Sequence, residues 1–203
     1  MTTTAQTNTF EIFIQLIKKW LIDLGINAQL FNELAGDEAL STGVRSLAIG
    51  VLLYLHAPVD LIPKKFRFFG LIDDMLVMIV GLVIIVPQIP EERLIYYRQE
   101  YEAVGKIGEY GLIVQSFLGI LWERLTRFVE TLQKRTYKNK TTEEVAQSAD
   151  LREALFDETM VFVANLGLDP ETLDKETKLL PSPEKLMGLL SSGLEKAQKH
   201  DKK

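Results

Sequence analysis

The chain has 203 residues and a mass of 23.0 kDa, which suits one large domain or one domain with a helical appendage. Its 28 acidic and 23 basic side chains give a net charge of -5, so we expect no nucleic-acid partner. The absence of cysteine excludes a disulfide scaffold, a zinc ribbon, an iron–sulfur site and a thiol nucleophile. Because residues 1–8 are polar and carry no basic side chain, we expect no secretion by a signal peptide.

The first predicted segment, residues 1–39, contains two amphipathic helices. Apolar side chains recur at three and four positions from Phe10 onward, which is typical of one face of an α-helix. Gly25 is the expected end of this helix, because glycine favours a helix C-terminus. A short helix over residues 28–35 is predicted to follow and to stop at Gly36.

The most apolar segment, residues 40–92, contains a predicted helix–loop–helix hairpin. Its first helix covers residues 44–55 and must end before Pro58, because proline disfavours a helical residue ahead of it. Its second helix covers residues 71–86 and is apolar except for two aspartates in its first turn. The sequence therefore predicts an all-α fold, a helical bundle built around this hairpin.

The third segment, residues 93–137, is predicted to hold long amphipathic helices. Three glycines, Gly105, Gly108 and Gly111, favour a bend ahead of a long helix over residues 112–137. That helix carries a heptad-like apolar seam, which predicts packing against a partner helix or self-association. The seam consists of Val114, Leu118, Leu121, Leu125, Phe128 and Leu132.

The last segment, residues 138–203, is predicted to be helical and to end in a charged tail. Residues 134–142 are polar and basic, and they are the predicted linker into this segment. Thr141 and Glu144 have the spacing of a capping box, which predicts a helix reaching to about Leu166.

Two runs within the hairpin are the most informative part of the sequence. Residues 54–63 read YLHAPVDLIP and residues 70–74 read GLIDD. These runs, with the apolar helices around them, resemble the YkvA-type domain, a small helical domain of unknown function found mainly in bacteria. The resemblance covers residues 40–92, and the family pattern falls on Pro58, Asp60, Leu61, Ile62, Pro63, Gly70, Asp73 and Asp74.

The chain departs from the family pattern in the loop between the two runs. Family members usually continue with an acidic and then an apolar loop, whereas this chain has three basic and three aromatic residues there. The resemblance therefore does not extend to a function that depends on an acidic loop. The resemblance implies a fold and proximity to a membrane, and it implies no enzymatic activity.

The three motif aspartates leave two interpretations open. Asp73 and Asp74 suit the N-terminus of a helix, and Asp60 suits a tight turn, so all three can be structural. Alternatively, Asp60, Asp73 and Asp74, with His56, form an oxygen-rich site for magnesium or calcium. His56 is more simply explained as a hydrogen-bonded residue at a helix end.

No sequence motif for catalysis is present. His56 and His200 are the only histidines, so no paired-histidine metal site exists. The run from Gly105 to Gly108 lacks the spacing of a phosphate-binding loop, and its glycines suit a hinge or close packing. We therefore expect no catalytic residue and no cofactor.

The hairpin also leaves two environments open. The helix at residues 71–86 would be about 24 Å long, short of the roughly 30 Å hydrocarbon layer, which favours a protein core. The loop combines cations and rings, which suits a lipid headgroup region on the cytoplasmic side and predicts contact with a membrane or a partner. The predicted contact residues are Lys64, Lys65, Phe66, Arg67, Phe68 and Phe69.

Three functions are compatible with these features. The first is a non-enzymatic, membrane-associated protein that acts as an anchor, scaffold or interaction module on the cytoplasmic side of a membrane. The second is a helical adaptor in the cytoplasm, in which the hairpin is the central layer of one bundle. The third is a cation-binding protein or enzyme centred on the acidic hairpin.

Overall fold

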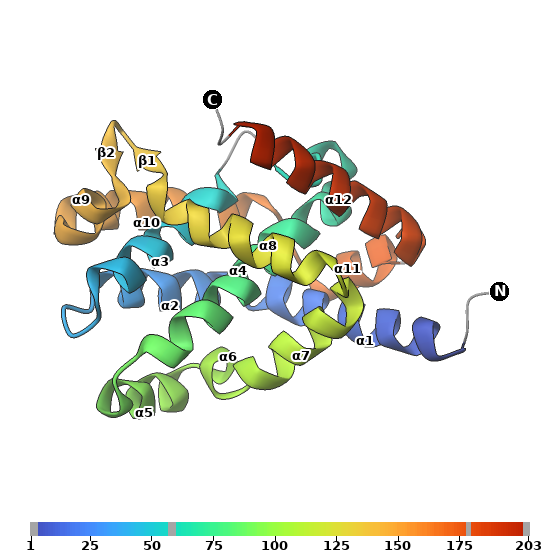
Figure 1. The fold of residues 1–203 in the computed structure, drawn as a ribbon, viewed down its shortest axis with the longest axis horizontal. Helices are drawn as coiled ribbons and strands as arrows, with labels where there is room; N and C mark the ends of the chain where they lie inside the picture. Colours follow the sequence, from blue (N-terminus) through green and yellow to red (C-terminus); the bar gives the residue numbers. More distant parts are fainter. Residues whose placement is uncertain (1–3, 57–59, 178–179, 201–203) are drawn as a thin grey trace.

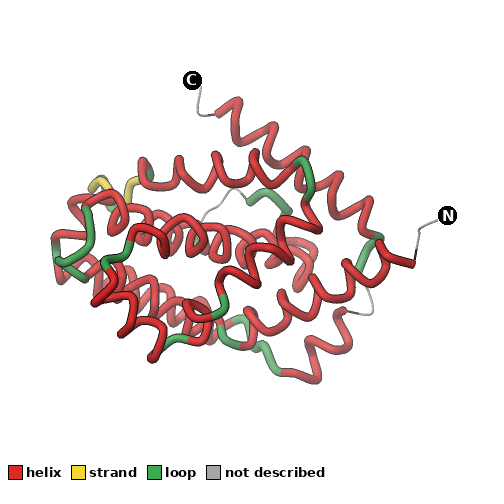
Figure 2. Tube along the Cα trace, turned by 60° about the horizontal axis from the view of Figure 1, so that its bottom comes forward, coloured by secondary structure: helices red, strands yellow, loops and turns green. Residues whose placement is uncertain are grey.

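The fold is all-α, as the sequence predicts. A computed structural model describes residues 4–56, 60–177 and 180–200, and nearly all of this part of the chain is helical (Figure 1, Figure 2). Two antiparallel strands of two residues each, β1 (Thr136–Tyr137) and β2 (Lys140–Thr141), are the only strands in the described ranges. All four sequence segments contribute side chains to one hydrophobic core.

The N-terminal region forms α1 (Thr4–Ile22) and α2 (Leu24–Gly36). The expected helix end at Gly25 is wrong, because the interruption falls at Asp23 and α2 continues through Gly25. A Cβ atom at Gly25 would lie 3.5 Å from the Met160 side chain, so Gly25 faces another helix instead of ending its own. The predicted stop at Gly36 is confirmed.

The predicted apolar hairpin is the centre of the bundle. Its first helix is α3 (Thr42–Leu55), and the Ser41 side chain caps it by accepting a hydrogen bond from the Val44 amide at 3.4 Å. A 3-10 helix, η1 (Lys64–Leu71), leads into the second helix, α4 (Ile72–Ile85), which passes into η2 (Val86–Gln88). Helix α4 packs against α1, α3, α7 and α8 and lies in the middle of the bundle (Figure 1). All of its apolar side chains except Val83 and Ile84 are buried.

The following helices are shorter than the sequence suggests. They are α5 (Glu91–Glu100), α6 (Glu102–Gly105), α7 (Ile107–Leu118), α8 (Leu121–Thr131) and η3 (Leu132–Lys134). The expected single helix over residues 112–137 is wrong, because the chain turns at Gly119, whose φ of 52° is a left-handed conformation that favours glycine. Gly111 lies within α7, where its missing side chain allows close contact with Val83 of α4.

The apolar seam predicted on this region faces the interior of the same chain. All six of its side chains are buried, including Val114 in α7, Leu125 in α8 and Leu132 in η3. Helix α8 contacts α4 and α12 (Pro183–His200), and η3 contacts α3. The prediction that the seam packs against helices is therefore confirmed, and those helices belong to this chain.

The predicted linker at residues 134–142 is wrong, because this stretch is a folded β-hairpin that packs on α9 (Thr142–Gln147). Tyr137 is buried, and its hydroxyl donates a hydrogen bond to Glu158 at 2.9 Å. The predicted capping box is confirmed, since Thr141 accepts from the Glu144 amide and Glu144 accepts from the Thr141 amide. Helices α10 (Ala149–Asn165) and α11 (Pro170–Thr177) follow.

Candidate functional site

The carboxylate of Asp73 joins three parts of the hairpin. Asp73 lies in the first turn of α4 and is fully buried, with 0% of its surface exposed. Its Oδ2 accepts hydrogen bonds from the Tyr54 hydroxyl at 2.6 Å, the Leu61 amide at 2.8 Å and the Ile62 amide at 3.1 Å. One oxygen atom therefore holds the last turn of α3 and the segment before η1 against the start of α4.

Tyr54 completes this arrangement from α3. Its hydroxyl donates to Asp73 and accepts a hydrogen bond from the Leu61 amide at 3.0 Å. The buried ring meets the edge of Phe128 in α8 at a centroid distance of 5.8 Å, and the Arg135 guanidinium lies 5.2 Å from the ring centroid. Burial and the negative charge of Asp73 raise the pKa of Tyr54 well above its ordinary value, so the phenol stays protonated and can donate.

The environment of Asp73 favours its protonated form more than water does. Burial raises the pKa of Asp73 to about 7, and the negative charge of Asp60 raises it as well. The hydrogen bonds from Tyr54 and Ile62 act in the opposite direction and lower this pKa. Oδ1 of Asp73 is buried and has no hydrogen-bond partner within the described residues. The Asp73 carboxyl can therefore exchange a proton near neutral pH. Its three hydrogen bonds hold α3 and the segment before η1 against α4.

Most of the other motif residues lie within the described part of the chain. Asp74 is buried, Asp60 is half-buried, Gly70 is buried and Pro63 is exposed, while Pro58 lies outside the described residues. Within the described ranges, no group of three or more histidine, cysteine, aspartate or glutamate side chains is placed to hold a metal ion. The alternative cation site at Asp60, Asp73 and Asp74 gains no support from this geometry.

The capping interpretation of Asp73 needs a correction. A carboxylate in the first turn of a helix is expected to accept hydrogen bonds from the amides of that helix. Asp73 instead accepts from Leu61 and Ile62, which precede its helix in the chain by about ten residues. Asp73 therefore caps a turn of the loop and not the start of α4.

The basic and aromatic loop occupies η1. The side chains of Lys64, Lys65, Phe66 and Arg67 lie outside the described residues. Phe68 and Phe69 are buried, with 4% and 8% of their surfaces exposed. Their predicted contact with a membrane or partner stays a prediction, and it would require the two rings to leave the core.

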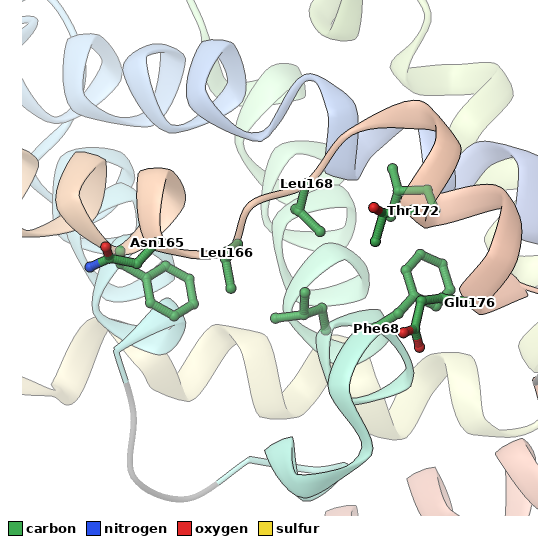
Figure 3. Close-up of a pocket in the computed structure, with 9 residues that line it drawn as sticks. Phe68, Asn165, Leu166, Leu168, Thr172 and Glu176 are labelled. Atoms are coloured by element: carbon green, nitrogen blue, oxygen red, sulfur yellow. The ribbon is translucent and has the colours of Figure 1, made fainter.

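An apolar pocket of about 250 Å³ lies beside Phe68 (Figure 3). One wall consists of Phe68 and Leu71, and the other consists of the end of α10 and the start of α11. On the second wall Leu168 faces the hollow, and Thr172 and Glu176 add polar groups. No local sequence pattern predicts this pocket, because its walls come from segments that lie about a hundred residues apart in the chain.

His56 and Tyr54 illustrate what the sequence could and could not assign. His56 is the cap residue at the end of α3 and exchanges a hydrogen bond with the Thr159 hydroxyl at 2.9 Å, as expected for a helix-end histidine. Tyr54 lies in the first informative run, but no role was predicted for it. Its position before the proline-containing turn was a usable signal, because a buried tyrosine hydroxyl normally finds a partner.

One helical stretch is long and apolar enough to cross a membrane by length and composition. It covers 21 residues, Phe68–Gln88, with a mean hydropathy of 2.5, and it is the only such stretch within the described residues. Within the bundle, 89% of its most apolar window is buried by other parts of the chain. A buried core helix has this composition as well, because it is covered on every side.

Comparison with known proteins finds a similarity between the hairpin and a family of unknown function. No curated protein and no solved structure matches the chain. Residues 44–80 match the family model described as "Protein of unknown function (DUF1232)". The match spans α3, the contact between Asp73 and residues 61–62, and the first part of α4. The hairpin is thus similar to a DUF1232 domain, and the predicted resemblance to a YkvA-type domain of unknown function is confirmed.

Proposed function

We propose that the protein is a non-enzymatic, membrane-associated interaction module that binds the anionic cytoplasmic face of a membrane through the basic loop of its buried hairpin. The observation that carries this proposal is the position of the Asp73 contact. Asp73 fixes Leu61 and Ile62 directly before η1, so the family residues serve to hold the start of the loop. Lys64, Lys65 and Arg67 then bring three positive charges within four positions.

The proposed association is peripheral and does not involve insertion of the hairpin. Helix α4 contacts α1, α3, α7 and α8, and most of its large apolar side chains are already removed from water. Insertion into lipid would have to separate these helices, and each exposed core side chain on the covering helices would cost roughly 1.5–3 kcal/mol. Surface binding leaves the core intact.

Local charge supports binding in spite of the acidic composition. The chain has a net charge of -5, so its overall field repels an anionic surface. Each basic residue near such a surface contributes about 1 kcal/mol of attraction, and this attraction decays within a Debye length of about 8–10 Å. Three adjacent basic residues can therefore dominate at short range, and binding should weaken as salt is added.

The first test measures binding to liposomes with and without anionic lipid. Changing Lys64, Lys65 and Arg67 together to Gln should weaken binding to anionic liposomes and remove most of its salt dependence. The matched control changes three exposed lysines of α12, Lys185, Lys196 and Lys199, to Gln, which alters the net charge by the same amount. Equal binding of the loop variant and the control variant would contradict the proposal.

The second test is fractionation of cell membranes. A peripheral protein should sediment with membranes at low salt and be released by high salt or alkaline carbonate. Resistance to carbonate would instead indicate that the hairpin is inserted in lipid. Release by simple lysis at low salt would exclude membrane association.

A cytoplasmic helical adaptor without membrane contact is the second candidate. The burial of the hairpin and of the Val114 to Leu132 seam favours it, because neither needs lipid or a second chain for cover. Self-association through that seam would require α7, α8 and η3 to leave their contacts within the chain. An unchanged molar mass over a wide range of protein concentration would exclude self-association.

A further inference from the structure

Two helix interruptions face each other on the side of the bundle formed by α1, α2, α5, α6 and α7. The chain leaves helical geometry at Asp23, between α1 and α2, and at Tyr101, between α5 and α6. Lys19 bridges the two places, because its Nζ lies 2.8 Å from Asp23 Oδ2 and 2.9 Å from Glu102 Oε2. A hollow of about 200 Å³ opens between them, and we call it the lysine-bridge pocket.

Aromatic side chains form the walls of the lysine-bridge pocket. Trp20, Tyr101 and Tyr110 all line it, and all three are buried. The Trp20 and Tyr110 rings meet edge to face at a centroid distance of 6.1 Å, and the Tyr101 hydroxyl donates a hydrogen bond to Glu33. The faces of such rings carry negative potential, which attracts a cation.

One polar group of this wall has no protein partner. Only 5% of Tyr110 is exposed, and its buried hydroxyl makes no hydrogen bond within the described residues. Native proteins leave few buried polar groups in this state, because an unsatisfied hydroxyl is destabilising. Since Tyr110 lines the pocket, a bound molecule there can supply the missing acceptor or donor.

The charged residues of the lining give the pocket a negative balance. The lining has three negative charges, on Asp23, Glu100 and Glu102. It has one positive charge, on Lys19, which pairs with both Asp23 and Glu102. Lys106, which is not part of the lining, also pairs with Glu102. When its charge is included, these five side chains carry one net negative charge. Glu100 is exposed and can meet an entering cation.

The ion cluster keeps its charges across the physiological range of pH. Hydrogen bonds from Lys106 and Lys19 lower the pKa of Glu102 to about 2. Hydrogen bonds to Asp23 and Glu102 hold the pKa of Lys19 above its ordinary value. Glu102 and Lys19 therefore both keep their charges near neutral pH.

We propose that the lysine-bridge pocket binds a small organic cation, an ammonium or guanidinium group on a short apolar stem, with its charge at Glu100 and its hydrogen bond at the Tyr110 hydroxyl. This binding site is independent of the membrane-associated function proposed above. The volume is below the roughly 300–1,000 Å³ of pockets for drug-sized ligands, so the ligand is small. A bare metal ion does not fit, because the Lys19 ammonium already lies between Asp23 and Glu102 and the rings supply no ligand atoms.

The test uses the fluorescence of Trp20. The chain has two tryptophans, so a Trp122→Phe background leaves Trp20 as the single reporter at the pocket wall. The full chain is titrated with n-butylammonium chloride and with guanidinium chloride below its denaturing range. Sodium chloride and sodium butyrate at equal ionic strength are the controls. We expect a saturable change in emission with the two organic cations and none with the controls.

Two variants assign the binding to named groups. Tyr110→Phe keeps the contact with Trp20 and removes the unpartnered hydroxyl, so the melting temperature without ligand should stay the same or rise while the affinity falls roughly tenfold. Glu100→Gln removes the carboxylate at the entrance and should weaken binding by a similar factor. Glu92→Gln, an exposed position in the same helix α5, is the matched control and should bind as the parent does.

Three results would overturn this proposal. The first is the absence of a saturable response to either organic cation. The second is an equal response to butyrate, which would indicate binding of the apolar stem without selection for charge. The third is unchanged affinity in both Tyr110→Phe and Glu100→Gln. None of these results depends on liposome binding, so the two proposals fail separately.

Discussion

The Tyr54 hydroxyl donates a hydrogen bond to Asp73 Oδ2 at 2.6 Å, and both side chains are buried between α3 and α4. The same hydroxyl accepts from the Leu61 amide, which also reaches Asp73. Two helices and the segment between them therefore meet at a single pair of oxygen atoms. This arrangement makes the hairpin a unit whose loop cannot shift without breaking several buried hydrogen bonds.

We expect Tyr54→Phe and Asp73→Asn to be energetically coupled. Phenylalanine keeps the contact with the Phe128 ring and loses the hydroxyl, while asparagine keeps an oxygen acceptor and loses the charge. Residues in one hydrogen-bond network show interaction energies of about 0.5–3 kcal/mol in double-mutant cycles. Urea unfolding of the two single variants and the double variant measures this term, and strict additivity would show that the two groups act independently.

Asp73→Ala should destabilise the protein more than Asp73→Asn. Alanine leaves the Leu61 amide, the Ile62 amide and the Tyr54 hydroxyl without this acceptor, and each buried unsatisfied group costs about 1–3 kcal/mol. Asparagine preserves an acceptor, so we expect it to be the more stable variant by at least about 2 kcal/mol. If alanine proved as stable as asparagine, the contact would contribute nothing to folding.

The stability of the protein should fall as pH rises through the titration of Asp73. Burial raises the pKa of this carboxyl to about 7 in the folded chain, above the ordinary value of about 3.9. Between these two values the folded state binds the proton more tightly than the unfolded state, so the stabilisation present at low pH is lost as pH rises. The charged or titratable groups around Asp73 are Tyr54, Asp60, Asp74 and Arg135.

The measurement compares the free energy of unfolding of the wild type and Asp73→Asn across this pH window. Because the variant lacks the carboxyl, its stability relative to the wild type should increase from about pH 4 to about pH 7. A constant difference across the window would show that the carboxyl titrates as it does in water. The comparison removes the titration of all groups that both proteins share.

Two glycines of α12 should respond in opposite directions to alanine. A Cβ atom at Gly193 would lie 2.3 Å from the Leu61 carbonyl oxygen, whereas a Cβ atom at Gly188 would meet nothing within 4 Å. Gly193→Ala must push α12 away from residues 60–63 and should lower the melting temperature. Gly188→Ala should raise stability by up to about 1 kcal/mol, because alanine has the higher helix propensity. Equal effects of the two changes would contradict the close packing of α12.

Leu121→Asp should unfold the protein. Leu121 begins α8 and is buried in the seam, so an aspartate there would place a charge in the core without a partner. Circular dichroism should show loss of cooperative unfolding. Ile120→Asp is the matched control, because Ile120 is exposed and its change should leave the unfolding transition nearly unchanged. A folded Leu121→Asp protein would mean that the seam is not part of the core.

Local sequence patterns predicted most of the fold. The apolar run of α4, the capping box at Thr141 and the seam from Val114 to Leu132 each arise from the spacing of neighbouring residues. The bend predicted near Gly105 is present, because α6 ends at Gly105 and α7 begins at Ile107, but the second break at Gly119 is not predicted because Gly108 and Gly119 look alike in the sequence. Only the packed structure puts Gly108 within a helix and Gly119 at a positive φ.

The candidate sites could be predicted only in part. The motif aspartates were recognised by their spacing, but the partners of Asp73 are amides on the loop, and a sequence carries no signal for a particular backbone amide. The lysine-bridge pocket depends on Lys19 meeting Glu102, two residues that no sequence pattern connects. Contacts between distant segments follow from the packing of the whole core and not from local propensity.

The close approach of Gly193 to Leu61 has a consequence for the order of folding. The hairpin can form its own contacts early, because α3 and α4 are neighbours in the chain. Helix α12 packs on residues 60–63. The ribosome completes it on the order of ten seconds after the hairpin. During that interval the growing chain exposes an apolar face of the hairpin segment, and a chaperone or an early membrane contact would protect it from aggregation.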